Sequence, residues 1–443
     1  MFGTTPGSAL CRDPPSKLPN AVEAGASRTG LAAISSSIVT TLSPIRRIRD
    51  MTGPQHKRAF LCPRSGKPLT ATELPEQQSQ WLRARPRAAM AVFPFSRQVM
   101  LSADGHTAYP IVDGIPVLLA PEVSMADGCD NFSPLDPRYA EAYAEMGHYN
   151  SVAAYAHDDI RQSHAYRTLS ACRGLSRDEQ ACFPYPVERW LEATYDVTAQ
   201  ETVFAHLSPV LEKDVLQVGG TGIHAIRFLL AGASTATLVT PMISEARFAR
   251  RLAQELAVAE RLSLAVGIFE ELPLPAASMD AVFSGGSLHH TLTDLALFEA
   301  ARVLKTGGKM GCFDPWRAPF YRIGIRLFGK REPGVFCRPL DNERTRYLRQ
   351  CFADAKVEKH GSLTRYLLLA LQKSGLDFTD DGTAGYNRVV HQVMRWDDSI
   401  TSLLPPLRKF ASSVSICASK TQRSEKGTNN EVEPRETLIQ SQS

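Results

Sequence analysis

The chain has 443 residues, of which 50 are basic and 46 acidic, so its net charge is +4. An apolar fraction of 43% and a charged fraction of 22% are those of an ordinary globular protein, and the length allows two or three domains. The chain contains no run of about 18 apolar residues, so it predicts no membrane span and no membrane partner.

The positive charge is concentrated at the start of the chain. Residues 1–58 carry eight basic and three acidic side chains, a net charge of +5, which leaves the remainder close to neutral. Nucleic-acid binding requires a basic face on the folded part. The charge distribution therefore predicts no nucleic-acid partner.

Residues 1–57 are rich in Ser, Ala, Thr, Gly and Pro and show no helical or strand period, which predicts a disordered leader. Two alternatives remain open: a mitochondrial transit peptide that ends in a basic cluster at 46–49, and translation that starts at Met51. The nine cysteines are odd in number, form no Cys-x-x-Cys pair and follow no secretory signal. Free thiols in a reducing compartment are expected, and the predicted localisation is cytoplasmic.

The sequence of residues 58–121 predicts a small β-rich module. Short strand candidates at 109–111 and 115–119 flank a turn at Asp113 and Gly114. With "AFLCPRSGKPLT" before it, this stretch resembles the zinc-ribbon-like domain of tRNA-methyltransferase activator proteins. The resemblance implies two cysteine pairs, but Cys62 is followed by Ser65 at the second ligand position, and no cysteine lies between Arg64 and Asp113. A tetrahedral site needs about four ligands, so we expect no metal and, as a role, packing or contact with a protein partner.

The rest of the chain divides into three predicted segments. Residues 122–205 read as irregular chain and helices, and residues 421–443 as a disordered tail. Between them, residues 206–420 alternate strand and helix patterns, with strands at 213–220, 236–241, 263–269, 279–287, 309–315, 354–362 and 412–420 and helices that include 245–258, 295–308, 364–375 and 388–396. This alternation predicts an α/β fold with a mostly parallel, seven-stranded Rossmann-like sheet and helices on both faces.

Three stretches in this order resemble the class I S-adenosylmethionine-dependent methyltransferases: "VLQVGGTG", "EELPLPAASMDAVFSGGSLHH" and "EAARVLKTGGKM". The resemblance covers residues 206–420 and implies S-adenosyl-L-methionine as the cofactor. It also implies acids at the ends of the first three strands, where this chain has Gln217, Thr240 with Pro241, and Phe269. Glu270 and Glu271 are close enough to substitute for the third acid.

The residues that the resemblance assigns to the cofactor site lie at the carboxyl ends of the strands, where ligands of such sheets bind. The glycines would bring the backbone close to the cofactor, because a Cβ would clash there. Gln217 and Thr240 retain polar groups that can hydrogen-bond. The predicted cofactor-binding residues are Gln217, Gly219, Gly220, Thr221, Gly222, Thr240, Pro241, Phe269, Glu270 and Ser284.

His289 and His290 follow the fourth strand, and Asp314 ends the fifth. Either histidine is suited to remove a proton from a hydroxyl acceptor, with Asp314 as an orienting or acceptor-binding carboxylate. The competing interpretation gives the histidines a role in packing and hydrogen bonding.

These observations predict a methyltransferase that acts on a small, hydroxylated acceptor. The preference for a small molecule rests on the lack of a basic folded surface and on Trp316 and Tyr321 near the fifth strand. The main alternative is a catalytically inactive scaffold with this fold, because the usual acids and zinc ligands are missing. A second alternative is a tRNA or protein methyltransferase whose β-rich module recruits a partner.

Overall fold

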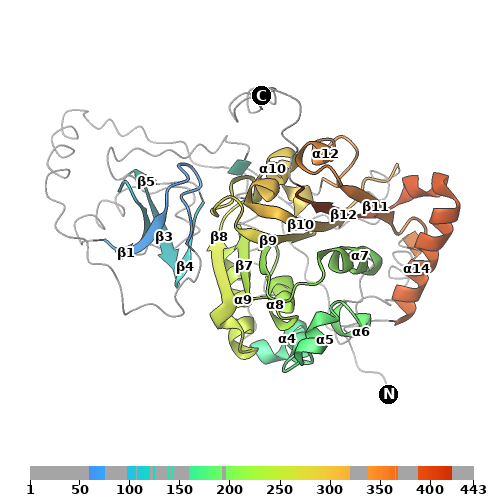
Figure 1. Ribbon diagram of the computed structural model, residues 1–443, viewed down its shortest axis with the longest axis horizontal. Helices are drawn as coiled ribbons and strands as arrows, with labels where there is room; N and C mark the ends of the chain where they lie inside the picture. Colours follow the sequence, from blue (N-terminus) through green and yellow to red (C-terminus); the bar gives the residue numbers. More distant parts are fainter. Residues whose placement is uncertain are drawn as a thin grey trace, which may run out of the picture. The chain divides into compact units, whose positions relative to one another are not determined.

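The computed structural model of the chain describes residues 59–74, 97–119, 123–124, 138–142, 159–191, 196–319, 338–367 and 388–421, except residues 106, 140, 141 and 365. Two β-sheets occur in these ranges (Figure 1). The leader predicted for residues 1–57 and all but the first residue of the tail predicted for residues 421–443 lie outside the described residues.

The larger sheet has seven strands in the order β11–β12–β10–β9–β6–β7–β8, and only β12 is antiparallel to its neighbours. The strands are β6 (Asp214–Val218), β7 (Thr235–Thr240), β8 (Leu262–Val266), β9 (Met279–Gly285), β10 (Leu304–Pro315), β11 (Lys356–His360) and β12 (Ser413–Ser419). Together with the helices below, this sheet confirms the predicted Rossmann-like α/β fold.

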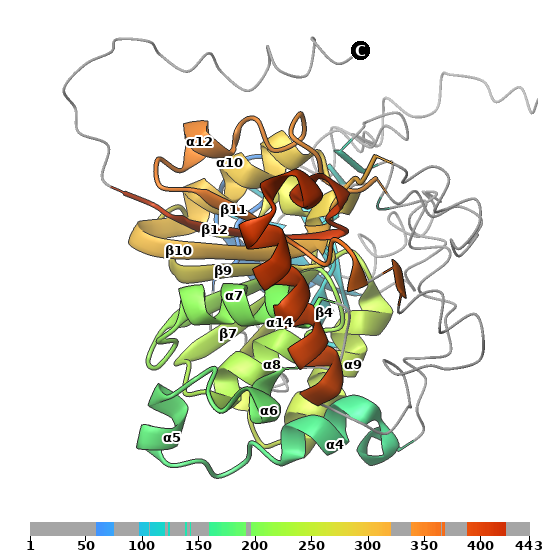
Figure 2. The same ribbon diagram turned by 90° about the vertical axis from the view of Figure 1, so that its right-hand side faces the viewer.

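Helices cover both faces of this sheet (Figures 1 and 2). Val215 of β6 belongs to a buried cluster with α7 and α8, whereas its neighbour Leu216 belongs to one with α10 and α12. Successive side chains of a strand point to opposite faces, so a strand that is apolar at every position is buried on both. The described helices are α4 (His164–Ser170), α5 (Arg177–Ala181), α6 (Val187–Trp190), α7 (Val197–Leu207), α8 (Ile223–Leu230), α9 (Ile243–Glu255), α10 (Thr293–Val303), α12 (Leu348–Cys351) and α14 (Arg388–Leu403).

One predicted helix is shorter than its sequence pattern indicates. The pattern places a helix at 295–308, but α10 ends at Val303, and Leu304 already pairs with Met279 of β9. The register of β10 shifts between Leu304 and Lys309, where Gly307 has a left-handed φ of 79°. The glycines predicted to lie in the helix therefore belong to the strand, where they allow an irregularity.

The smaller sheet is formed by the predicted module, except that its strand β5 lies just beyond residue 121. Its strands are β1 (Leu69–Glu73), β2 (Gln98–Ser102), β3 (Thr107–Val112), β4 (Ile115–Pro116) and β5 (Val123–Ser124). β3 and β4 form an antiparallel hairpin through Asp113 and Gly114, whose φ values of 51° and 73° are both positive. A two-residue hairpin turn of this kind needs two positive φ values, which Asp and Gly tolerate.

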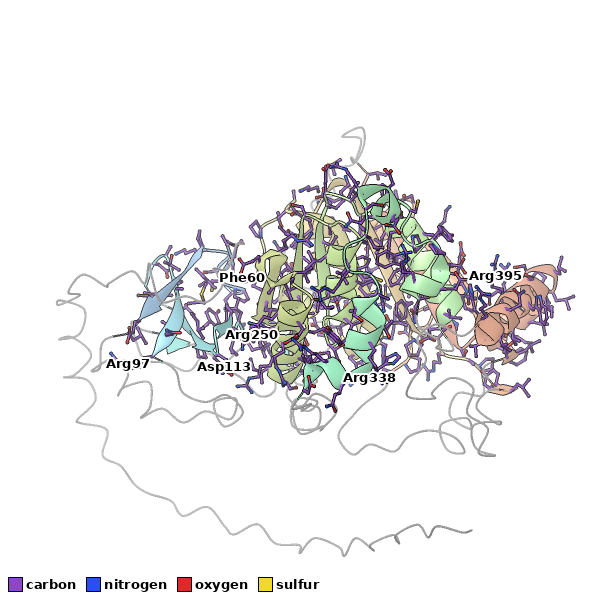
Figure 3. The ribbon with its side chains drawn as sticks, turned by 90° about the horizontal axis from the view of Figure 1, so that it is seen from below. Phe60, Arg97, Asp113, Arg250, Arg338 and Arg395 are labelled. Atoms are coloured by element: carbon purple, nitrogen blue, oxygen red, sulfur yellow. The ribbon has the colours of Figure 1, made fainter. Side chains whose placement is uncertain are left out.

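This module is joined to the edge strand β8 of the larger sheet. Val117 forms a parallel bridge with Val266, and the amide of Leu118 donates to the carbonyl of Val266 at 2.8 Å. Phe60 and Leu118 are buried in one cluster with residues of the larger sheet. In addition, Arg250 of α9 donates to the carbonyl of Asp113 in the hairpin turn (Figure 3). The module therefore covers a strand edge that would otherwise expose unpaired backbone groups.

Candidate cofactor and active site

The glycine turn after β6 has the backbone conformation that its sequence requires. Gly219, Gly220 and Gly222 have φ values of 75°, 70° and 78°, which side-chain-bearing residues rarely adopt. A Cβ on Gly219 would lie 2.3 Å from the Oγ of Ser287, so glycine is also required by the close approach of the loop after β9. A Cβ on Gly220 would meet no atom closer than 3.6 Å, so this residue borders open space.

Gln217 holds this turn from inside the protein. Its side-chain amide donates to the carbonyl of Gly219 at 2.8 Å, and its oxygen accepts from the amide of Ala225 at 2.6 Å. The residue is only 2% exposed and does not line the pocket described next. The polar group that the sequence places here for a ligand is therefore engaged with the backbone.

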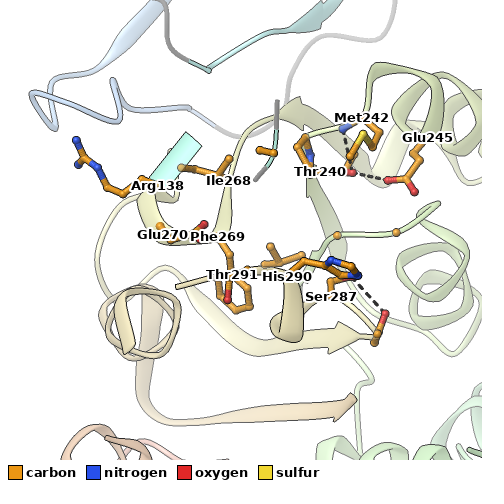
Figure 4. A pocket seen from close by; sticks show the side chains of 17 residues that line it. Arg138, Thr240, Met242, Glu245, Ile268, Phe269, Glu270, Ser287, His290 and Thr291 are labelled. Carbon is orange, nitrogen blue, oxygen red and sulfur yellow. Dashed lines mark hydrogen bonds between the residues drawn. The ribbon is translucent and has the colours of Figure 1, made fainter. Parts of the chain in front are cut away.

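A pocket opens at the carboxyl ends of β6, β7, β8 and β9 (Figure 4). It contains about 850 Å³ of space not occupied by atoms, part of which is open solvent at its mouth. Seven predicted site residues line it: Gly219, Gly220, Thr240, Pro241, Phe269, Glu270 and His290. The other six lie outside the lining: Gln217, Thr221, Gly222, Ser284, His289 and Asp314.

The lining also contains a carboxylate that is not among the residues predicted from the sequence. Glu245 lies in the first turn of α9, is 7% exposed and accepts a hydrogen bond from the hydroxyl of Thr240 (Figure 4). Thr240 was expected to substitute for the acid at the end of β7, but its hydroxyl proton is directed to Glu245. The only signal in the sequence is an acid five residues past the strand end, at the start of a helix pattern.

The two acids after β8 have separate roles. Glu270 lines the pocket and accepts from the amide of Leu292 at 2.8 Å. Glu271 forms an ion pair with Arg138 at 2.8 Å and accepts from the hydroxyl of Tyr139. Since Arg138 also lines the pocket, Glu271 fixes one wall of the pocket from behind.

The loop after β9 presents His290 to the pocket and is held on both sides of it. Asp314 accepts from the amide of His289 at 3.1 Å, and its Oδ1 lies 2.6 Å from the Nδ1 of the same residue. The guanidinium of Arg344 donates to the carbonyls of His289 and Thr291, at 3.0 and 2.7 Å. The backbone of His290 is thus fixed by groups that are distant in the sequence.

Asp314 is itself buried, at 2% exposure. Burial raises the pKa of the neighbouring Cys312 thiol well above its ordinary value, and the negative charge of Asp314 raises it further. The thiol therefore stays protonated, and its Sγ lies 2.7 Å from the second oxygen of Asp314 as a donor. The carboxylate of Asp314 thus faces His289 and Cys312, behind the pocket.

The expected preference for a small-molecule acceptor depends in part on Trp316 and Tyr321. Trp316 is 4% exposed and lies outside the lining, with the Nζ of Lys359 4.3 Å from its ring centroid. Tyr321 lies outside the described residues. The structure therefore gives Trp316 a packing position.

Among the described residues, no group of three or more His, Cys, Asp or Glu side chains could hold a metal ion. Cys62 is 1% exposed, and its Sγ lies 3.3 Å from the hydroxyl of Tyr109. The absence of zinc stays a prediction from the sequence.

Residues 216–312 match a family described as a methyltransferase domain. The tRNA U34 carboxymethyltransferase of Geobacter sp. (strain M21) is 32% identical over 112 residues, which are 25% of this chain and 34% of that protein. The ubiquinone/menaquinone biosynthesis C-methyltransferase UbiE of Acidiphilium cryptum (strain JF-5) is 36% identical over 97 residues, 22% of this chain and 39% of that protein. The chain thus spans little more than a third of the length of these curated relatives.

Solved structures give a more distant likeness. The geranyl diphosphate C-methyltransferase of Streptomyces coelicolor A3(2) has a TM-score of 0.39 and 15% identity, over 66% of this chain and all of that chain. The [4+2]-cyclase SpnF has a TM-score of 0.35 and 22% identity, over 51% of this chain and 82% of that chain. Neither comparison tests the zinc-ribbon-like resemblance of residues 58–121. The family match itself covers the glycine turn and strands β6 to β9, so this part of the chain is similar to a methyltransferase domain.

Proposed function

We propose that residues 206–420 bind S-adenosylmethionine and transfer its methyl group to a small, hydroxylated acceptor. The observation that carries this proposal is the pocket itself, which combines the backbone of a glycine turn with a buried carboxylate, Glu245. Ligands of open α/β sheets bind at this end of the strands.

Two features of the pocket suit the cofactor: the space left by its glycines and the carboxylate of Glu245. A Cβ on Gly286 would meet no atom within 4 Å, so Gly220 and Gly286 both leave space in the pocket that they line. Glu245 has the charge and the position next to β7 that suit a pair of ribose hydroxyls, and Thr240 holds its carboxylate in place. The carboxylate missing from the end of β7 is thus supplied from the following helix.

When bound, the cofactor supplies a methyl group on a positively charged sulfur. The protein then has to hold the acceptor in line and take its proton. His290 is the residue of the catalytic set that lines the pocket, so we assign the role of base to it. His289 and Asp314 position its loop and do not contact the acceptor.

Two alternatives are separated by experiment. The comparisons give no support to a catalytically inactive scaffold, and the buried carboxylate in the pocket is unnecessary for one. An RNA acceptor would be favoured if RNA co-purified with the protein and protected it against thermal unfolding. That result would make the small-molecule acceptor wrong but leave the cofactor assignment intact.

Calorimetric titration of S-adenosylmethionine and S-adenosylhomocysteine into the full-length protein tests the proposal. We expect micromolar binding, abolished in Gly220→Trp because the indole would occupy the pocket. Gly66→Trp, at a glycine with no atom within 4 Å of its Cβ and outside the pocket, is the control for a general effect of the indole. No heat and no thermal shift at millimolar ligand would show that the pocket does not take this cofactor.

A further inference from the structure

Exposed apolar side chains are concentrated in one region of the described surface. Ten large hydrophobic residues are exposed among the described residues, and eight of them belong to two short stretches of the chain. We call these eight the α14 patch: Leu363, Tyr366, Leu367, Val389, Trp396, Ile400, Leu403 and Leu404. The two stretches are linked, since the hydroxyl of Tyr366 donates to the carbonyl of Phe410 at 3.1 Å and the amide of Leu363 donates to Asp397 of α14 at 2.8 Å.

Helical spacing explains how α14 contributes to this patch. Val389, Trp396, Ile400 and Leu403 are separated by seven, four and three residues, which places them on one side of a helix. Val390 and Met394 lie on the opposite side and are buried against the sheet. The helix therefore has a second apolar side, which the core does not use, and Leu403 is 82% exposed there.

The exposed charges of the segment that carries this apolar side have one sign, although Arg388 also forms an ion pair with Glu188 of α6 at 3.2 Å. Every charged side chain that is exposed between residues 388 and 409 is basic: Arg388, Arg395, Arg408 and Lys409. The acids of this segment are turned inward, because Asp397 is buried and Asp398 lies 2.7 Å from the ring of His360. Figure 2 shows α14 along its length, and Figure 3 marks Arg395 on it.

We propose that the α14 patch binds the surface of a membrane that contains anionic lipids. A helix side with a tryptophan and aliphatic residues, on a segment whose own exposed charges are all basic, is suited to lie in the headgroup region of a bilayer. Tryptophan favours this interface, and basic residues are attracted to anionic headgroups. The convex surface of a helix suits a fluid interface better than it suits a folded partner, which would need a complementary groove.

This binding is peripheral and does not require a span, so it departs from the expectation of no membrane partner, which rested only on the lack of a long apolar run. None of the helices in the described part of the chain is long and apolar enough to cross a bilayer. Nor does the proposal depend on the assigned reaction, because the patch and the pocket share no residue.

Co-sedimentation of the full-length protein with vesicles tests this proposal. The probes are phosphatidylcholine vesicles with and without phosphatidylglycerol. We expect binding to the mixed vesicles and a loss of about tenfold or more in affinity for the double variant Trp396→Ser/Leu403→Ser. Arg395→Gln should weaken binding about fivefold, whereas Lys213→Gln, at an exposed lysine outside the patch, should leave it unchanged.

Two features of this design keep the outcome clear. The substituted side chains are exposed, so the variants should fold, and circular dichroism checks that they do. The basic leader of residues 1–58 is intact in every variant, so its own attraction to anionic vesicles cancels in the comparison. Equal binding by the wild type and the double variant would overturn the proposal. So would a dimer in the absence of lipid that the double variant converts to a monomer, since the patch would then bind a second copy of the chain.

Discussion

The module of residues 58–121 and the glycine turn at 219–222 both lack polar groups that family resemblance assigns to them, and they differ in what replaces those groups. Cys62 is the one cysteine in the sequence of the module, and it lies next to the hydroxyl of Tyr109 and in an apolar cluster. At the turn, Gln217 is used by the backbone, while Glu245 supplies a carboxylate to the pocket from another element.

This difference indicates what each region has to do. A module that covers a strand edge can be held by apolar burial alone, so nothing in it has to restore a metal site. A pocket for a charged, hydroxyl-rich ligand still needs polar groups, and under the proposed function the carboxylate of Glu245, at a new position, meets that need. Loss of a motif therefore has different consequences in a structural region and in a ligand site.

The largest effect is expected where the module meets the larger sheet. Leu118 is 1% exposed and is buried between the two regions, so Leu118→Ala should lower the free energy of unfolding by about 2–5 kcal/mol. Urea denaturation measures this change. Lys67→Ala, at an exposed lysine of the same module, should cost less than about 1 kcal/mol. Equal costs would show that the contact with β8 contributes little.

The second largest effect is expected for Glu245, the carboxylate that lines the pocket from α9. Glu245→Gln should weaken the binding of S-adenosylhomocysteine by about 1.5–3 kcal/mol, because a charge-assisted hydrogen bond is lost. Glu260→Gln, at an exposed glutamate beyond the end of the same helix, is the matched control and should bind as the wild type does. Unchanged calorimetric affinity in Glu245→Gln would place the ribose contacts elsewhere.

A third substitution restores the acid that the family resemblance implies. Gln217→Glu should not raise the affinity for the cofactor, because residue 217 lies outside the pocket lining. A carboxylate also cannot donate to the carbonyl of Gly219, so the variant should be less stable by about 1–3 kcal/mol. Calorimetry and thermal unfolding measure the two effects. Tighter binding would mean that the turn rearranges and that the side chain of residue 217 contacts the cofactor.

The smallest effect is expected for metal removal. A chelator should shift the melting temperature by less than about 1 °C, since a folding contribution from zinc needs about four ligands. Metal analysis of the purified protein should also find less than about 0.1 zinc per chain on the same ground. A stoichiometric metal, or a large fall in melting temperature, would mean that ligands outside the described residues complete a site with Cys62.

The fold was predictable because its signals are local. Short apolar runs, helix periods and a glycine turn identify the strands in their succession along the chain, and the Asp113–Gly114 pair identifies the hairpin. The end of α10 was not predictable in this way. Whether the glycines at 307 and 308 cap a helix or interrupt a strand depends on pairing with β9, which is a tertiary contact.

The site was predictable only in part, for the same reason. The residues that end strands, such as Thr240 and His290, do line the pocket. Glu245 was missed because the turn after β7 brings it back to the pocket, and nothing in the sequence specifies that return. Arg344 gave no signal either, since it acts on the backbone of His289 from 55 residues away. Their assignment to the cofactor and to the reaction stays a prediction that the variants above test.

The pairing of Val117 and Leu118 with β8 has a consequence for how the protein behaves in dilute solution. A separate polypeptide that covered this strand would dissociate as its concentration fell, and the strand edge would become exposed. Here the covering segment is part of the same chain, and a tether of this kind commonly gives an effective concentration in the millimolar range. The edge therefore stays covered whether the protein is scarce or abundant, and its cover cannot be diluted away.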